Sequence, residues 1–339
     1  SLTEERGAAR LSAEPLRFGG QPALRLAPGY KRLRGFGATA PRWTPPQGFA
    51  LRYGSVSSDP VYSGTYIASG YRIGYLRIPS FPTGSRGAAM LRAVEQEAQF
   101  FQNNVDGVVV DVTRNPGGEV CLTNELLRRM IYYRFRTVGD EFRPTLDTVQ
   151  LFRDDYENYL QFGSDPVILA YLKAFYDDVF TAYREFRGRT GPLPVCGFSL
   201  DLEPARSANG TLLAVTKPMI VLIDEFTTSS GDVFAAVLQD AGRALMVGRQ
   251  TAGGGGLIEL FRTGVWGEKQ VTLSTTLGVR GKEYEAPGLP RSSYIENIGA
   301  LPDIELDYQT RDNLMNGGRA YVDGFTQAIV EQIRRSTAP

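Results

Sequence analysis

A polar segment from Asp224 to Asp232 contains the side chain best placed for nucleophilic chemistry. Its Ser229 follows a buried apolar run and precedes a helical pattern that begins near Ser230. A helix N-terminus offers unpaired backbone N–H groups and the positive end of the helix dipole, and both stabilise developing negative charge. Ser229 is therefore a candidate nucleophile with an oxyanion donor beside it. The alternative is that Ser229 or Ser230 only caps the helix, as serine commonly does.

Two glycine-containing turns could complete such a site. Asn115-Pro116-Gly117-Gly118 follows an apolar run that ends near Asp111. Its glycines leave backbone N–H groups open to a ligand, so this turn could supply a second oxyanion donor, although an ordinary strand-to-helix turn has the same character. The run Gly253–Gly256 lacks the Gly-x-x-x-x-Gly-Lys frame of a nucleotide-binding loop. Its glycines favour close approach of a peptide or a neighbouring strand to the backbone.

The composition restricts the chemistry. The 339 residues include no histidine, which is the usual general base near neutral pH, so most hydrolase mechanisms need a substitute or a second polypeptide. Lysine and arginine together number 37, as do aspartate and glutamate, which argues against a polyanionic partner such as nucleic acid. Cys121 and Cys196 lack metal-ligand spacing, so we expect neither a metal site nor a disulfide framework. No apolar run reaches the roughly 20 residues of a membrane helix, and the first residues do not form a signal peptide.

The elements that must position these residues alternate between strands and helices. Short β-branched runs predict paired strands at 62–68 and 71–78 and buried strands at 107–112 and 219–223. Helical spacing of apolar residues predicts helices at 88–101, 120–133 and 230–238. This order favours an α/β core with largely parallel strands.

The remaining segments are less regular. Residues 1–60 are rich in Gly, Pro and Arg and predict an extended N-terminal arm or linker. The stretch 145–190 is helical in pattern and 188–216 is loop-like, so we expect a helical insertion or lid at about 145–215. Short strands are expected at 257–261, 269–274 and 276–280, and a closing helix at 313–335.

Taken in order, these segments resemble the tail-specific, or C-terminal-processing, serine peptidases. The resemblance extends from about residue 70 to 335 and rests on four ordered matches: 73–78, 108–118, 219–229 and 238–251. It implies the α/β spiral of the ClpP and crotonase type. It also implies that residues 61–339 form a serine peptidase catalytic domain.

Most members of this family use a Ser/Lys dyad, and the lysine would fall at Gly254, so the dyad is absent. The sequence is similar to a smaller Ser/His/Glu branch that includes chlamydial protease-like activity factor and, distantly, tricorn protease. The matching segments are 229–232, 251–253, 294–299 and 310–312. The resemblance implies that Ser229 is the nucleophile, that Glu296 orients the histidine, and that Gly117, Gly118 and Ser230 form the oxyanion hole. The alternative for Glu296 is a solvated loop carboxylate.

The resemblance implies a serine endopeptidase that acts on proteins or peptides through an acyl-serine intermediate, without metal or organic cofactor. Because the relatives' histidine lies upstream of the matched region, we expect an N-terminal fragment or domain to supply it, and this chain to be inactive in isolation. The relatives also imply an exported or secreted protein, and a homodimer is compatible with this interpretation. The alternative is a catalytically inactive pseudoprotease that binds extended peptides.

Overall fold

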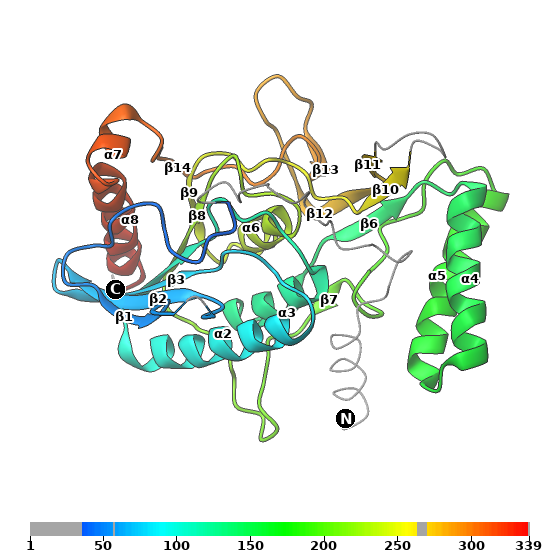
Figure 1. Ribbon diagram of the computed structural model, residues 1–339, viewed down its shortest axis with the longest axis horizontal. Helices are drawn as coiled ribbons and strands as arrows, with labels where there is room; N and C mark the ends of the chain where they lie inside the picture. Colours follow the sequence, from blue (N-terminus) through cyan, green and yellow to red (C-terminus); the bar gives the residue numbers. More distant parts are fainter. Residues whose placement is uncertain (1–35, 57, 263–269, 338–339) are drawn as a thin grey trace. The chain divides into compact units, whose positions relative to one another are not determined.

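The computed structural model describes residues 36–56, 58–262 and 270–337. At residues 260–262 and 270 it describes the backbone alone. The described residues divide into two compact units (Figure 1). Of the described residues, the larger unit contains those in the ranges 36–137, 201–255 and 280–337. The smaller unit contains 138–200, 256–262 and 270–279.

The larger unit is built on a sheet of seven strands among the described residues, in the order β1-β2-β3-β4-β8-β9-β14. Strands β1, β2 and β3 are antiparallel, whereas β3, β4, β8, β9 and β14 run parallel. Every residue of β4 and β8 is buried, as is typical of central parallel strands. This arrangement confirms the predicted α/β fold. The bounds are β1 (Ala50–Tyr53), β2 (Tyr62–Ala68), β3 (Tyr71–Arg77), β4 (Gly107–Asp111), β8 (Met219–Ile223), β9 (Leu245–Gly248) and β14 (Ile304–Glu305).

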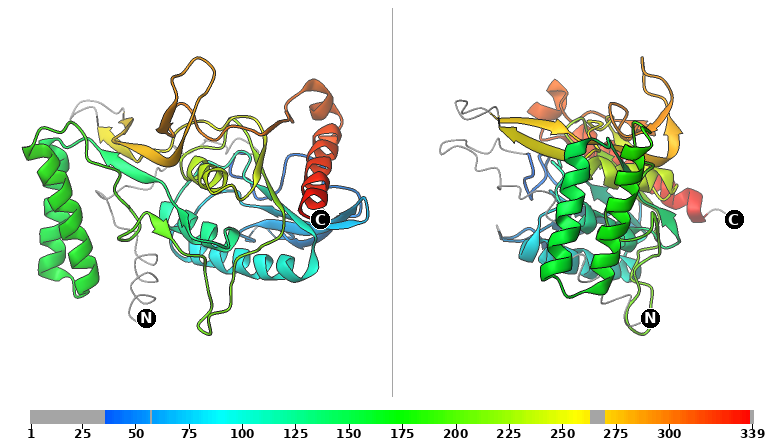
Figure 2. Two further views of the ribbon diagram at one scale, coloured as in Figure 1. Left: turned by 180° about the vertical axis from the view of Figure 1, so that it is seen from behind. Right: turned by 90° about the vertical axis from the view of Figure 1, so that its right-hand side faces the viewer.

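Helices cover both faces of this sheet. A side chain at Gly74 would collide with Phe101 of α2 (Gly84–Asn104), while the adjacent Tyr75 packs against Phe325 of α8 (Arg319–Thr337). Because neighbouring residues of a strand point to opposite faces, α2 and α8 lie on opposite sides. Figure 2 shows α2 side by side with α3 (Val120–Met130), which in turn contacts α6 (Ser230–Asp240).

The end of the chain differs from the single closing helix that the sequence predicts. A short helix α7 (Arg311–Met315) stops before α8 begins at Arg319. Gly317 and Gly318 between them have φ angles of 65° and 77°, which other residues adopt at a cost. A Cβ at Gly318 would also lie 2.5 Å from Trp43 Cβ. The periodicity of apolar residues continues across this break, which explains the wrong prediction.

The predicted arm contributes to the core where the structure describes it. Trp43 is 4% exposed and packs against Tyr308, Tyr321 and Phe325. Residues 50–53 form the edge strand β1. Residues 1–35 lie outside the described residues, so the domain boundary at residue 60 stays a prediction.

The smaller unit contains two helices within the expected helical insertion, α4 (Leu146–Phe162) and α5 (Pro166–Arg184). Phe152 of α4 and Phe175 of α5 meet with ring centroids 4.9 Å apart, and both contact Phe142 of β6 (Gly139–Phe142). Strand β6 pairs with the first residues of β12 (Thr276–Tyr284), and β10 (Ile258–Arg262) pairs with β11 (Gln270–Ser274). The predicted start of the second strand at Lys269 lies outside the described residues. Among residues 36–337 as described, no helix has the length and apolar character to cross a membrane.

Three short strands complete the described elements. Strand β5 (Phe135–Arg136) pairs antiparallel with β7 (Asp201–Leu202), and β13 (Ser292–Tyr294) neighbours β12. Both β5 and β7 belong to the larger unit. The sequence pattern predicts none of the three, because runs of two or three residues have no measurable period.

Candidate active site

Ser229 lies in the sharp turn between β8 and α6 and has an unusual backbone. Its φ and ψ angles are 58° and −127°, a region that residues with a side chain rarely adopt. The residue occupies the N-cap position of α6, but its side chain makes no capping hydrogen bond. The capping interpretation is therefore wrong for Ser229. A serine with a strained backbone between a strand and a helix, whose side chain makes no capping hydrogen bond, is a candidate for the nucleophile position of such a turn.

The glycine turn after β4 lies directly against Ser229. A Cβ at Gly117 would be 2.5 Å from Ser229 Cβ and 2.9 Å from its Oγ. Thr228 N–H donates to the Asn115 carbonyl at 2.9 Å, and Ser230 Oγ donates to the Gly118 carbonyl at 2.8 Å. The structure thus brings the two turns together that the sequence singles out. Only glycine at position 117 leaves room for the serine.

The backbone N–H groups of this turn differ in their partners. Gly117 N–H donates to the side-chain oxygen of Asn115 at 2.8 Å, so it is not available to a ligand in this conformation. In the described part of the chain, the N–H groups of Gly118 and Ser230 have no backbone acceptor. The oxyanion-hole role of Gly117, Gly118 and Ser230 stays a prediction. In this conformation Gly117 provides space for Ser229, and its own N–H is bonded to Asn115.

Asp232 joins the nucleophile turn to the glycine-rich loop. Its side chain is fully buried and accepts hydrogen bonds from Gly253 N–H at 3.0 Å and Gly254 N–H at 2.9 Å. It also accepts from the Ser229 N–H and the Thr251 side chain. Burial raises the pKa of this carboxyl, whereas the four donors act in the opposite direction. The sequence places Asp232 in the polar segment but does not indicate this bridging role.

The turn that carries Glu296 packs against the same loop. Asn297 N–H donates to the Gly253 carbonyl at 2.9 Å, and a Cβ at Gly255 would lie 2.6 Å from Ile295. Glu296 itself is half-buried between these two residues. The structure connects Glu296 to Ser229 through the glycine-rich loop and Asp232. At Gly254, where the dyad lysine would fall, a Cβ would face Thr228 Oγ1 at 3.0 Å.

A second buried carboxylate, Asp224, is hydrogen-bonded to the turn that contains Gly117 and Gly118, and the sequence does not single it out for this role. Asp224 directly follows β8, and its Oδ1 accepts from Arg114 N–H at 2.8 Å and from Thr227 Oγ1 at 2.9 Å. Tyr308 donates to the other oxygen at 2.6 Å. Burial raises the pKa of Asp224, and the bond from Arg114 is the largest opposing influence. Arg114 has a φ of 55°, so this bond helps to hold a strained turn beside Ser229. The only sequence signal is an acidic residue at the end of a buried strand.

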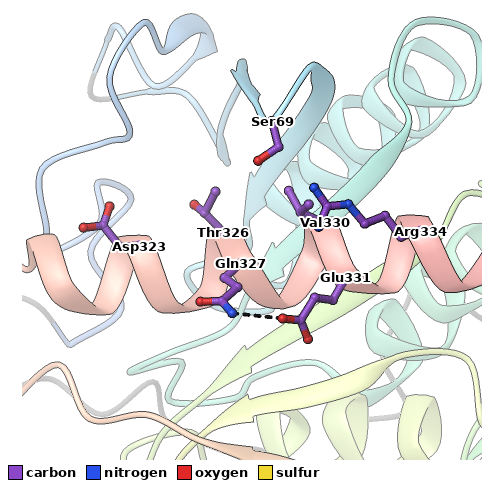
Figure 3. Close-up of a pocket in the computed structure, with 7 residues that line it drawn as sticks. All are labelled: Ser69, Asp323, Thr326, Gln327, Val330, Glu331 and Arg334. Carbon is purple, nitrogen blue, oxygen red and sulfur yellow. Dashed lines mark hydrogen bonds between the residues drawn. The ribbon is translucent and has the colours of Figure 1, made fainter.

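A cavity of about 360 Å³ lies elsewhere, between α8 and the β2–β3 turn (Figure 3). Gln327 and Glu331 on its wall are joined by a hydrogen bond of 2.9 Å. None of the predicted site residues lines this cavity. Within the described part of the chain, no three His, Cys, Asp or Glu side chains converge as a metal site would require. The cavity lining consists of Ser69, Asp323, Thr326, Gln327, Val330, Glu331 and Arg334.

The chain is similar to several known proteins. A protein from Chlamydia trachomatis is 28% identical over 291 residues, which cover 78% of this chain and 45% of the relative. The carboxyl-terminal-processing peptidase 3 of Arabidopsis thaliana chloroplasts is 25% identical, with coverage of 78% and 35%. This chain thus spans less than half the length of these relatives.

Solved structures agree with the fold. The structure of mature CPAF complexed with lactacystin superimposes with a TM-score of 0.70 at 24% identity, over 90% of this chain and 61% of that chain. A CPAF mutant, s499a, gives a TM-score of 0.68 at 23% identity over 98% of this chain and 61% of that chain. At this level of identity the likeness concerns the fold, and it agrees with the expected tail-specific peptidase architecture. The model of peptidase family S41 matches residues 72–306, which include the strained serine and both glycine-containing turns. This chain belongs to peptidase family S41.

Proposed function

We propose that this chain is the serine-bearing catalytic part of an endopeptidase that hydrolyses peptide bonds through an acyl-serine intermediate. The observation that carries the proposal is the strained backbone of Ser229. Its hydroxyl makes no capping hydrogen bond and lies against Gly117 of the glycine turn. Strain of this kind costs about 1–3 kcal/mol and persists where the surrounding structure enforces it. A purely structural serine would gain nothing from it.

In the proposed reaction, Ser229 Oγ attacks the substrate carbonyl carbon while a base removes the hydroxyl proton. The carbonyl oxygen becomes an oxyanion that accepts hydrogen bonds from the N–H groups of Gly118 and Ser230. The amine leaves with the proton from the base, and water then hydrolyses the acyl-serine by the same route. Glu296 orients the base and stabilises its protonated form.

The base is the histidine that this chain lacks. We propose that an upstream polypeptide, either a fragment or an N-terminal domain, supplies it. Substrates would be proteins or peptides in extended form, and a homodimer and export from the cytoplasm belong to the same proposal. The family membership and the intact serine turn support this assignment.

The lack of histidine favours one other function. A groove that binds extended peptides without turnover would need the fold and the glycine-rich loop but not the Ser229 hydroxyl. The two functions differ in their dependence on that one oxygen atom.

The test measures hydrolysis of an unfolded protein by the purified chain alone, with the upstream polypeptide, and with added imidazole as a substitute base. We expect turnover only when a base is provided, and its loss in Ser229→Ala. Ser69→Ala, a serine in the cavity beside α8, is the matched control and should retain full activity. Saturable peptide binding without turnover, unchanged in Ser229→Ala, would instead establish the binding function.

A further inference from the structure

Arg280 is a buried cation that joins two parts of the larger unit. Its side chain is 2% exposed, and its guanidinium pairs with Asp240 at 2.6 Å. It also donates to the Gly299 carbonyl at 2.7 Å and to Gln239 Oε1 at 3.0 Å. A buried charge is costly unless it is paired and hydrogen-bonded, so these contacts fix Arg280 and its partners relative to each other.

The partners of Arg280 lie at both sides of the candidate site. Asp240 is the last residue of α6, the helix whose N-terminus follows Ser229. Gly299 closes the turn that carries Glu296, because both its N–H and that of Ile298 donate to the Ile295 carbonyl, at 2.7 and 3.0 Å. Arg280 therefore connects the far end of the nucleophile's helix to the turn of the carboxylate.

We propose that Arg280 is a positioning residue for Glu296. The inference rests on the proposed function, in which Glu296 orients the base. Helix α6 acts as a rigid rod of roughly 16 Å, from 1.5 Å per residue, with Ser229 at one end and the Arg280–Asp240 pair at the other. The pair sets the position of the Gly299 carbonyl, and thereby that of Glu296 three residues earlier in the same tight turn.

Only a guanidinium can hold the Glu296 turn in this way, because its several N–H groups point in fixed directions toward several acceptors. A lysine has the same charge, but its ammonium cannot reach the Asp240 carboxylate, the Gln239 amide and the Gly299 carbonyl together from one stem. Arg280→Lys therefore keeps the charge in the core and releases part of the turn.

The chain offers a matched control in Arg243. This arginine is also buried, at 8% exposure, and donates to the carbonyls of Met130, Val215 and Lys217 at 2.7–2.9 Å. It lies just beyond the end of α6 but makes none of these bonds to the Glu296 turn. Arg243→Lys thus removes part of the hydrogen bonding of another buried guanidinium, without altering the turn that carries Glu296.

The experiment compares Arg280→Lys, Arg243→Lys, Glu296→Gln and the double variant Arg280→Lys/Glu296→Gln in the assembly with the histidine-bearing polypeptide. We expect Arg280→Lys to lower kcat at least tenfold with KM within twofold, and Arg243→Lys to change kcat less than threefold. The double variant should be no slower than Glu296→Gln. Because a displaced carboxylate stabilises the imidazolium less, the acid limb of the kcat/KM profile should move to lower pH in Arg280→Lys and in Glu296→Gln, but not in Arg243→Lys.

A second measurement does not depend on turnover. Amide hydrogen exchange in residues 295–300 should accelerate at least tenfold in Arg280→Lys and stay unchanged in Arg243→Lys. If Arg280→Lys does not fold, Asp240→Asn tests the same contact with the same two readouts. Equal losses of kcat in the two lysine variants, or multiplicative losses of kcat from Arg280→Lys and Glu296→Gln, would overturn the positioning role of Arg280. They would leave the proposed role of Glu296 intact. A fully active Glu296→Gln would overturn the proposed role of Glu296 and the inference with it.

Discussion

The free energy that Asp232 contributes depends on the number of donors it satisfies. Four donors converge on one buried carboxylate, and one of them is the N–H of Ser229 itself. Two oxygens with several lone pairs can accept all four, whereas an amide replaces one acceptor by an NH₂ group. The residue is thus suited to fix the strained turn and the glycine-rich loop at the same time.

We therefore predict that Asp232→Asn lowers the free energy of unfolding by about 3 kcal/mol, because at least one buried donor loses its acceptor. It should also lower hydrolysis in the reconstituted assembly more than tenfold, since Ser229 would be held less precisely. Urea unfolding followed by circular dichroism gives the first quantity and the peptidase assay the second. Asp323→Asn, an exposed carboxylate on α8, is the control. Equal stability of the two variants would rule out the bridging role.

At this scale the sequence predicts positions better than roles. Ser229 can be found because it stands between a β-branched run and a helical pattern, and Gly118 because it follows another such run. The bond from Gly117 N–H to Asn115 and the donors around Asp232 depend on how two turns meet in space. The local sequence pattern does not predict which turns come into contact.

At the scale of elements, the predicted bounds of strands and helices match the structure best where the apolar pattern is longest. Strands β2, β4 and β8 lie within a residue of their predicted bounds, because each has at least five residues with a strand pattern. Short strands such as β5 and β14, each of two residues, have no period to detect. The break between α7 and α8 depends on the contact of Gly318 with Trp43, far away in the sequence.

Helix α4 in the smaller unit contains a carboxyl group that should make stability depend on pH. Burial, with a smaller effect of the neighbouring Asp154, raises the pKa of Asp155 from 3.8 to about 6. A folded-state pKa above the unfolded value gives stability that is fully present below about pH 4 and is lost as the pH rises through 6.

We predict that Asp155→Asn is more stable than the parent at pH 8, by about 1 kcal/mol after discounting for solvent at this half-buried site. The difference should vanish near pH 4, where both side chains are neutral. Thermal unfolding at a series of pH values measures it. Asp178→Asn, which removes an exposed carboxylate from α5, controls for net charge. A gain that is the same at pH 4 and pH 8 would contradict the assignment.

At the scale of the whole molecule, the sequence predicts the fold class and a helical insertion, but it does not indicate that Trp43 of the expected N-terminal arm is buried. The segment 36–60 has the composition of a linker, rich in proline and glycine. Its Trp43 nevertheless packs against Tyr308 and Tyr321 near the other end of the chain, with ring centroids 5.6 and 4.7 Å away. One aromatic residue in an otherwise irregular segment carries no periodicity, so pattern reasoning cannot assign it to a core.

This packing leads to a prediction about how far the folded unit extends. Trp43→Ala should lower the free energy of unfolding by about 3–5 kcal/mol, because it removes a large buried ring from an aromatic cluster. Trp43→Phe should cost much less, since it keeps most of the ring and removes an indole N–H that has no partner among the described residues. Urea titrations of both variants, followed by circular dichroism, measure the two values. If residues 36–60 were only a linker, both variants would unfold at the urea concentration of the parent. A large loss in Trp43→Ala alone would place the start of the folded unit before residue 43, so that any designed fragment of this chain must include that residue.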